Sequence, residues 1–186
     1  MYLIDYKLYI VPTADRRASP DRAAFVGRPR PLGMLRRVLD RFGGDRERPD
    51  RVAVLVDGPN VLRGEFDVDL DDVRASAERA GQLVAKRLYL DEHATPGLIQ
   101  AAEARGFEVV VTSGDVDVKL AIDGTELVAD GDLDVLAVAS RDTDFKPLLE
   151  AAARNGVCTL AIAPGEHGRS DALRNAAHDA VVLTEQ

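Results

Sequence analysis

The sequence predicts an α/β protein with a three-layer α/β/α architecture, in which a central parallel sheet is covered by helices on both faces. Two uninterrupted Val-rich apolar runs, 52–56 and 135–139, are typical of strands buried on both sides, as parallel sheets require. Predicted strands and helices alternate strictly along residues 51–186, the pattern of parallel strands joined by helical crossovers. A glycine stands where each of four helices should end: Gly81, Gly106, Gly131 and Gly156.

The predicted elements follow one another without a long gap. Apolar runs predict strands at 51–56, 83–90, 107–112, 134–140, 157–163 and 179–183. The segments between them predict helices at 69–80, 96–105, 116–130, 144–154 and 170–177. Thr95-Pro96 and Ser170-Asp171 are typical of helix starts, because Thr and Ser cap the first turn and Pro is tolerated there.

Two segments precede residues 51–186, which we call the body of the protein. Residues 1–33 contain four prolines and scattered arginines without a sustained period, which predicts a flexible basic arm. Residues 34–50 are expected to hold a basic amphipathic helix and a charged linker. The helix ends before Gly43-Gly44, and its apolar positions recur at helical spacing: Met34, Leu35, Val38, Leu39 and Phe42.

Charge is distributed unevenly over a chain whose net charge is −8. Residues 1–51 carry 12 Arg and Lys against 7 Asp and Glu, whereas the rest carries 12 against 25. An acidic body is unusual for a protein that binds nucleic acid. The 20 Arg, 4 Lys, 22 Asp and 10 Glu resemble the composition of proteins from halophilic archaea. There, at ~1 M salt, the Debye length of ~3 Å screens repulsion between an acidic protein and an acidic partner.

The compartment predicted from the sequence is the cytoplasm. No apolar run approaches the roughly 20 residues of a membrane span. Asp5 and Lys7 interrupt the first apolar residues, so a secretory signal is not expected. Cys158 is the single cysteine, which excludes an intrachain disulfide. Because it lies in the apolar run 157–162, we expect it to behave as a small buried hydrophobic residue.

Polar residues follow two central strands of the predicted sheet. Asp57 and Asn60 come after the first strand, and Asp142 and Asp144 come after the fourth. Because ligands collect at the carboxyl ends of parallel strands, we expect these side chains to meet. The Asn60 amide could orient a phosphate, a water or Asp57. Each acid could instead cap a helix or form an Asx-turn, which Asp and Asn do frequently.

A third group of acids follows the third strand, at the start of a helix. Asp117 is our first choice for the shared cluster and Asp115 our second. Asp123 lies six residues from Asp117 and cannot share its direction on a helix, so we expect it to pair with Lys119 at i,i+4.

A cluster of carboxylates needs a counter-charge. Two carboxylates ~5 Å apart repel by ~3 kcal/mol at an effective dielectric of 20, so a cation or bound protons must relieve the cluster. Oxygen ligands suit a hard divalent cation such as Mg²⁺ or Mn²⁺. The pattern therefore predicts metal-assisted chemistry on a phosphate ester.

Three motifs in this order resemble the NYN domain family of the PIN-like nuclease superfamily, which includes LabA-like proteins. They are Asp57-Gly-Pro-Asn60, Asp117-Val-Lys-Leu-Ala-Ile-Asp123 and Ser140-Arg-Asp142-Thr-Asp144-Phe145. The resemblance covers residues 51–186 and implies a PIN-like fold and a Mg²⁺- or Mn²⁺-dependent ribonuclease. It implies five catalytic residues: Asp57, Asn60, Asp117, Asp142 and Asp144. The four acids would also bind the metal, with Asn60 beside them. Where the family usually has a glycine, this chain has Arg141, which either crowds the site or contacts a phosphate.

The expected partner is RNA. Candidate RNA contacts, near the strand ends or in a glycine-containing loop, are Arg63, Ser140, Arg141 and Arg169. The basic segment before residue 51 could hold RNA or dock a protein partner. A homodimer is expected only by analogy, because PIN-like domains often pair.

Two alternatives to a ribonuclease remain at this point. The first is a catalytically weak or inactive PIN-like module that binds RNA or protein without cleavage. The second is another acidic α/β enzyme. A haloacid-dehalogenase-like phosphatase would place Asp-x-Asp directly after its first strand, where this chain has Asp57-Gly58-Pro59. A Toprim-type site would need Glu at that first position.

Overall fold

The computed structural model describes residues 48–62, 69–165 and 171–183. The predicted arm 1–33 and the predicted helix within 34–47 lie outside the described residues. Arg63 and Arg169, two of the expected RNA contacts, also lie outside them.

Six parallel strands form one sheet in the order β3-β2-β1-β4-β5-β6. The strands are β1 (Arg51–Asp57), β2 (Gln82–Asp91), β3 (Glu108–Thr112), β4 (Val135–Ala139), β5 (Cys158–Pro164) and β6 (Asp179–Leu183). The helices are α2 (Gly58–Val61), α3 (Leu70–Glu78), α4 (Pro96–Ala104), α5 (Val116–Ala129), the 3₁₀ helix η2 (Thr143–Phe145), α6 (Lys146–Arg154) and α7 (Asp171–Ala176). The predicted three-layer architecture is confirmed.

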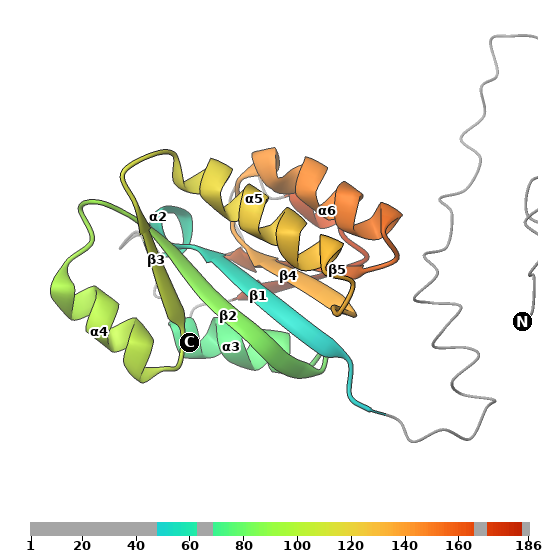
Figure 1. Ribbon diagram of the computed structural model, residues 1–186, viewed down its shortest axis with the longest axis horizontal. Coiled ribbons are helices and arrows are strands. Elements are labelled where there is room, and N and C mark those ends of the chain that lie inside the picture. The colour runs from blue at the N-terminus through green and yellow to red at the C-terminus, as the bar shows by residue number, and fades with distance from the viewer. Residues whose placement is uncertain (1–47, 63–68, 166–170, 184–186) are drawn as a thin grey trace, which may run out of the picture.

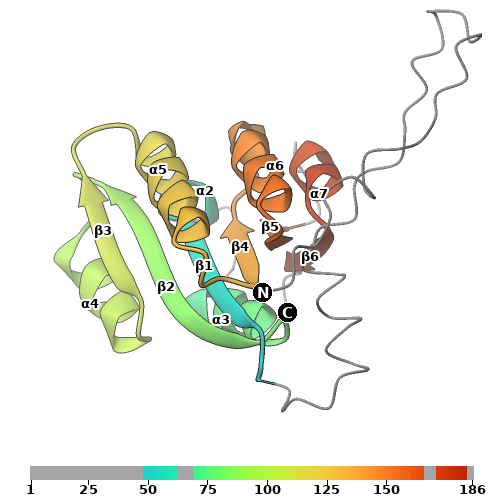
Figure 2. The ribbon, with the colours of Figure 1, turned by 45° about the vertical axis from the view of Figure 1, so that its right-hand side comes forward.

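Helices cover the two faces of the sheet in two groups (Figure 1). Helices α3 and α4 lie on one face, and α5, α6 and α7 lie on the other, as the turned view also shows (Figure 2). Each face has its own apolar core, because successive residues of a strand point to opposite sides. In β1, Val54 packs with residues of the α3 face and Leu55 with those of the α5 face, and both are fully buried.

Most predicted boundaries agree with the observed ones to within a residue or two. The helix predicted at 144–154 begins with η2, because Asp142 caps that turn through the backbone N–H of Asp144. The short helix α2 was not predicted, because its four residues are too few to show a helical period. Positive φ angles at Gly106, Gly131 and Gly156 (80°, 75° and 81°) confirm the left-handed residues expected at those helix ends. Gly81 differs, with φ 151°.

The strand order changes direction between β1 and β4. The crossovers that leave β1 and β2 carry α3 and α4 on one face, whereas those that leave β3 and β4 carry α5 and α6 on the other. Such a switch opens a crevice at the carboxyl ends of the two central strands, where α/β proteins bind their ligands. The residues that follow β1 and β4 therefore define the candidate site.

None of the helices in residues 48–62, 69–165 and 171–183 combines the length and the apolar character of a membrane span.

Candidate active site

Asp57 ends β1 and is fully buried. Its Oδ2 accepts hydrogen bonds from Asn60 Nδ2 at 2.7 Å and from Ser140 Oγ at 2.8 Å. Its Oδ1 accepts one from the backbone N–H of Asn60 at 3.3 Å, which makes Asp57 the N-cap of α2. The helix cap and the candidate site thus use the same side chain, because each carboxylate oxygen can accept two hydrogen bonds.

Gly58 allows the chain to turn directly after Asp57. A Cβ atom at this position would lie 2.4 Å from Leu90 Cδ2 and 2.6 Å from the backbone oxygen of Tyr89. Only glycine lets α2 approach β2 this closely. Pro59 follows in the first turn of α2, where its missing N–H and fixed φ suit a helix start. The sequence Gly-Pro therefore holds Asp57 and Asn60 at the end of β1.

The pKa of Asp57 is raised above its ordinary value, mainly because burial removes water from the charged carboxylate. Hydrogen bonds from Ser140 and Asn60 lower it, and the charge of Asp142 raises it. Burial outweighs the three donors. A counter-charge at this site would therefore stabilise the ionised form of Asp57.

Ser140 follows β4 and joins the two strand ends. It is fully buried, and its Oγ donates to Asp57 while accepting the backbone N–H of Asp142 at 2.9 Å. Asp142 is half-buried, and its Oδ1 accepts the backbone N–H of Asp144 at 2.9 Å. Asp144 is exposed in the first turn of η2. This chain of hydrogen bonds sets the position of Asp142 relative to Asp57.

The third group of acids lies at the start of α5. Asp115 is the N-cap and is exposed, and its Oδ1 accepts the backbone N–H of Asp117 at 3.0 Å. Asp117 is half-buried, and its pKa is raised to about 6. The largest cause is burial, followed by the negative charges of Asp57, Asp142, Asp115 and Asp144 in that order.

The charges of Asp57, Asp142, Asp115 and Asp144 all act on Asp117, so acids from three separate segments share one region of the protein. The structure brings Asp57, Asp117, Asp142 and Asp144 close enough for their charges to interact, and we call these four residues the acidic cluster. In the described part of the chain, no three or more His, Cys, Asp or Glu side chains are already arranged to hold a metal ion.

Asp123 does not belong to the acidic cluster. As expected, it pairs with Lys119, whose Nζ lies 2.6 Å from its Oδ1. The other carboxylate oxygen accepts the Tyr89 hydroxyl at 3.1 Å and lies 3.8 Å from a guanidinium nitrogen of Arg87. Burial raises the pKa of Tyr89, so its hydroxyl stays a donor. The contacts from β2 were not predicted, because nothing in the sequence indicates how α5 lies over that strand.

Two expected RNA contacts are described by the structure. Ser140 was expected to contact RNA. It is instead fully buried, and its hydroxyl forms hydrogen bonds with the carboxylate of Asp57 and with the backbone N–H of Asp142. Arg141 is half-buried beside it on the same turn. Its contact with a phosphate stays a prediction.

The chain is similar to several known proteins over this body. The model of the NYN domain matches residues 51–184. An uncharacterised protein of Methanocaldococcus jannaschii is 40% identical over 141 residues, which are 76% of this chain and 58% of that protein. The chain thus matches less than two thirds of that relative's length. A crystal structure of a Vibrio parahaemolyticus protein of unknown function has the same fold, with a TM-score of 0.64 and 22% identity over 76% of this chain and 97% of that one. Since the family model covers most of its length, this chain belongs to the NYN domain family.

Proposed function

We propose that this protein is a metal-dependent ribonuclease that hydrolyses RNA phosphodiester bonds through the acidic cluster. The observation that carries the proposal is the convergence of acids from three segments around Asp117, which is half-buried and whose pKa burial and four neighbouring carboxylates raise to about 6. Unrelieved repulsion of this kind destabilises a fold, and strongly perturbed acids collect at functional sites. Membership of the NYN domain family supports a nuclease-like function.

The donor set of the acidic cluster fits Mg²⁺ or Mn²⁺. All four side chains offer carboxylate oxygens, the ligands that hard divalent cations prefer. Mg²⁺ sites commonly use only one or two carboxylates and complete the shell with water and substrate phosphate. Such a site does not require three protein ligands to be arranged in advance. A bound cation would polarise the scissile phosphate and make a water more acidic.

The residues around the acidic cluster would position it. Asn60, which follows β1, and Ser140, which follows β4, together fix both oxygens of Asp57. Asp142 and Asp144 lie on the turn that Ser140 begins, so they are held relative to Asp57. Arg141, on the same turn, would offer a guanidinium to an RNA phosphate beside the acids. The acidic body would then bind RNA best when metal or salt reduces its negative potential.

The test is cleavage of a mixed pool of labelled RNAs by the purified full chain in high potassium chloride, with Mn²⁺, with Mg²⁺ or with chelator. We expect cleavage with metal, none with chelator, and a loss of at least about 100-fold in Asp144→Ala and Asp117→Asn. Asp130→Asn is the matched control, because Asp130 is an exposed acid at the far end of the same helix α5. It should cleave like the wild type.

A binding module without cleavage is the competing function, and the same variants separate the two. If the protein is a nuclease, Asp144→Ala loses cleavage and still binds RNA in a filter or gel assay. RNA binding by the wild type without cleavage in any metal would overturn the proposed activity. Equal cleavage by the wild type and by both cluster variants would show that another site, or a contaminant, is responsible.

A further inference from the structure

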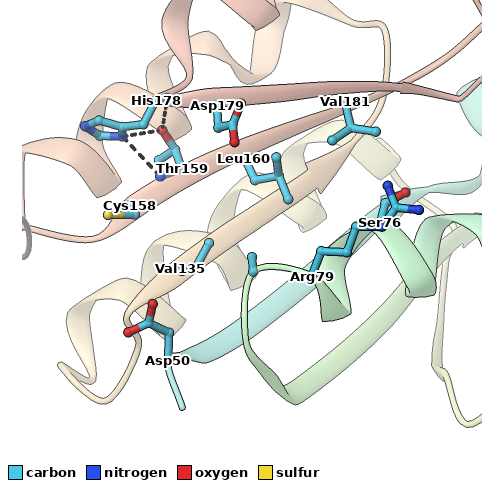
Figure 3. A pocket seen from close by; sticks show the side chains of 11 residues that line it. Asp50, Ser76, Arg79, Val135, Cys158, Thr159, Leu160, His178, Asp179 and Val181 are labelled. Atoms are coloured by element: carbon cyan, nitrogen blue, oxygen red, sulfur yellow. Dashed lines mark hydrogen bonds between the residues drawn. The ribbon is translucent and has the colours of Figure 1, made fainter. Parts of the chain in front are cut away.

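A groove of about 620 Å³ lies on the α3 face of the sheet, near the first residues of β4, β5 and β6 and so away from the acidic cluster. Figure 3 shows the residues that line it. Its floor is formed by apolar side chains of three neighbouring strands, namely Val135 of β4, Leu160 of β5 and Val181 of β6. Ser76 of α3 and Arg79, the residue at the C-cap of α3, form one side of it. The groove therefore lies where the sheet continues past α3.

The topology explains why this groove exists. Every crossover after β3 lies on the opposite face of the sheet, so in the described part of the chain α3 is the helix that reaches β5 and β6 on this side. Val181 and Cys158 are only half-buried as a result. The expectation that Cys158 is buried was therefore wrong, because no described helix lies over the first residue of β5.

The rim of the groove is polar and includes two carboxylates. Asp179 at the start of β6 is exposed, and Asp50 lies just before β1 at one end of the groove (Figure 3). An amphipathic, positively charged segment would match this surface, with its apolar side on the strands and its charges at the rim.

We propose that residues 34–42 of this same chain occupy the groove. Their sequence pattern combines an apolar side, Met34, Leu35, Val38, Leu39 and Phe42, with three arginines, Arg36, Arg37 and Arg41. The segment is tethered at the groove, because Asp50 forms part of the rim and follows residue 42 by only eight positions. Seven intervening residues reach at most roughly 25 Å, so the segment is held near the groove at high effective concentration.

Charge favours this occupant over a second copy of the body. Residues 1–51 carry an excess of basic residues, whereas the remainder carries 12 Arg and Lys against 25 Asp and Glu. Two acidic bodies repel, whereas a basic segment is attracted to an acidic one. The docked segment would complete the helical layer over β5 and β6. It would lie away from the carboxyl ends of β1 and β4, so this inference is independent of the proposed nuclease activity.

The groove contains the only cysteine of the chain, which allows a direct test by cross-linking. Leu35→Cys places a second thiol on the apolar side of the segment. Arg36→Cys, one residue further along, places it on the polar side with nearly the same tether. With a mild oxidant such as diamide, we expect the Leu35→Cys protein to form an intramolecular disulfide with Cys158. The reaction should be at least about tenfold faster than in the Arg36→Cys protein. The same variants with Cys158→Ser should form none within the chain.

A second measurement needs no new thiol. In the full-length chain, the docked segment should shield Cys158 from a water-soluble thiol reagent. Phe42→Asn removes the largest apolar side chain of the segment and should raise the rate of Cys158 modification about tenfold, because the segment then leaves the groove more often. Asp40→Asn introduces the same residue on the polar side, where it removes a negative charge, and should not raise the rate.

Three results would overturn the proposal. The first is equal intramolecular cross-linking of Leu35→Cys and Arg36→Cys together with unchanged Cys158 reactivity in Phe42→Asn. The second is a disulfide that joins two chains instead of closing one, which would assign the groove to a second copy. The third is a small molecule that native mass spectrometry finds bound to the wild type and absent from Val181→Asp, a substitution at a half-buried position of the groove.

Discussion

The hydroxyl of Ser140 donates a 2.8 Å hydrogen bond to Oδ2 of Asp57, although 83 residues separate the two in the sequence. Both side chains are fully buried. Their contact joins the carboxyl ends of β1 and β4, the two strands between which the sheet changes direction. The arrangement of the acidic cluster therefore depends on a residue that is not itself an acid.

Replacing Ser140 by Ala should weaken both the fold and the site. Asp57 would lose a donor to its buried carboxylate, and the backbone N–H of Asp142 would lose its acceptor. We expect a loss of about 1–3 kcal/mol in the free energy of unfolding, measured by urea denaturation. The pKa of Asp57 should rise further, because Ser140 now lowers it.

Thr125→Ala is the matched control for this substitution. Thr125 is exposed, and its hydroxyl donates to the backbone oxygen of Ala121 at 2.7 Å, so the variant also removes one hydroxyl and one hydrogen bond. A change within about 0.5 kcal/mol is expected there. If Ser140→Ala were no more destabilising than Thr125→Ala, the contact between the strand ends would not matter to the fold.

Asp117→Asn should raise the melting temperature of the metal-free protein at pH 7.5. The substitution removes a charge that the other acids repel, and its half-exposed position limits the gain to about 2 °C. Asp130→Asn, at the far end of α5, should not reproduce this gain. A lower melting temperature for Asp117→Asn at pH 7.5 would show that its neighbours stabilise the charge of Asp117.

The same variant should behave most like the wild type at pH 3.5, below the ordinary pKa of the carboxyl group. The pKa of Asp117 is about 6 in the folded protein and 3.8 in its ordinary state, so the folded state binds a proton more tightly. The stability that this proton contributes is complete below pH 3.8 and is lost as the pH rises through 6. The difference in melting temperature between variant and wild type should therefore grow between pH 4 and pH 6 and change little above that. A constant difference across this range would contradict the assigned pKa.

Divalent metal should stabilise the wild type and should have little effect on Asp117→Asn. For a site with a dissociation constant of about 1 mM, 10 mM Mg²⁺ or Mn²⁺ adds about 1.4 kcal/mol, which is about 3–6 °C in a chain of this size. Differential scanning fluorimetry measures the shift. NaCl at matched ionic strength is the control. No shift in the wild type at millimolar metal would argue against the acidic cluster as a metal site.

Gly58→Ala should disturb the start of the site without removing any functional group. Its Cβ would lie 2.6 Å from the backbone oxygen of Tyr89, so α2 or β2 must move. We expect a loss of about 1–3 kcal/mol in stability, the usual effect of overpacking, together with weaker cleavage because Asp57 and Asn60 are displaced. Gly97→Ala is the control, because a Cβ there meets no atom within 4 Å. Equal stability of Gly58→Ala and Gly97→Ala would contradict the close approach of α2 to β2 at Gly58.

Much of the fold could be predicted from residue patterns alone. The fully apolar runs that form β1 and β4 indicated central strands, and the glycines at positions 106, 131 and 156 marked the helix ends. Such signals are local, because a buried strand and a left-handed turn each restrict the residues at one place. The helix α2 was not recognised, since its four residues are too short to show a period.

The site was only partly predictable. Local spacing sufficed for the Asp123–Lys119 pair, since one turn of a helix separates the two. The burial of Ser140 and the contact of Tyr89 with Asp123 depend on how distant elements pack, which no single segment encodes. The choice of Asp117 over Asp115 also rests on packing, because Asp115 caps α5 and stays exposed whereas Asp117 is half-buried.

The most direct test of the acidic cluster as a metal site is an anomalous difference map from crystals of the full chain soaked in MnCl₂. We expect a Mn²⁺ peak between the carboxyl ends of β1 and β4, with at least one oxygen of Asp57, Asp117, Asp142 or Asp144 within roughly 2.5 Å of it. A map with no peak at these residues, or with Mn²⁺ bound only elsewhere on the protein, would contradict the proposed metal site.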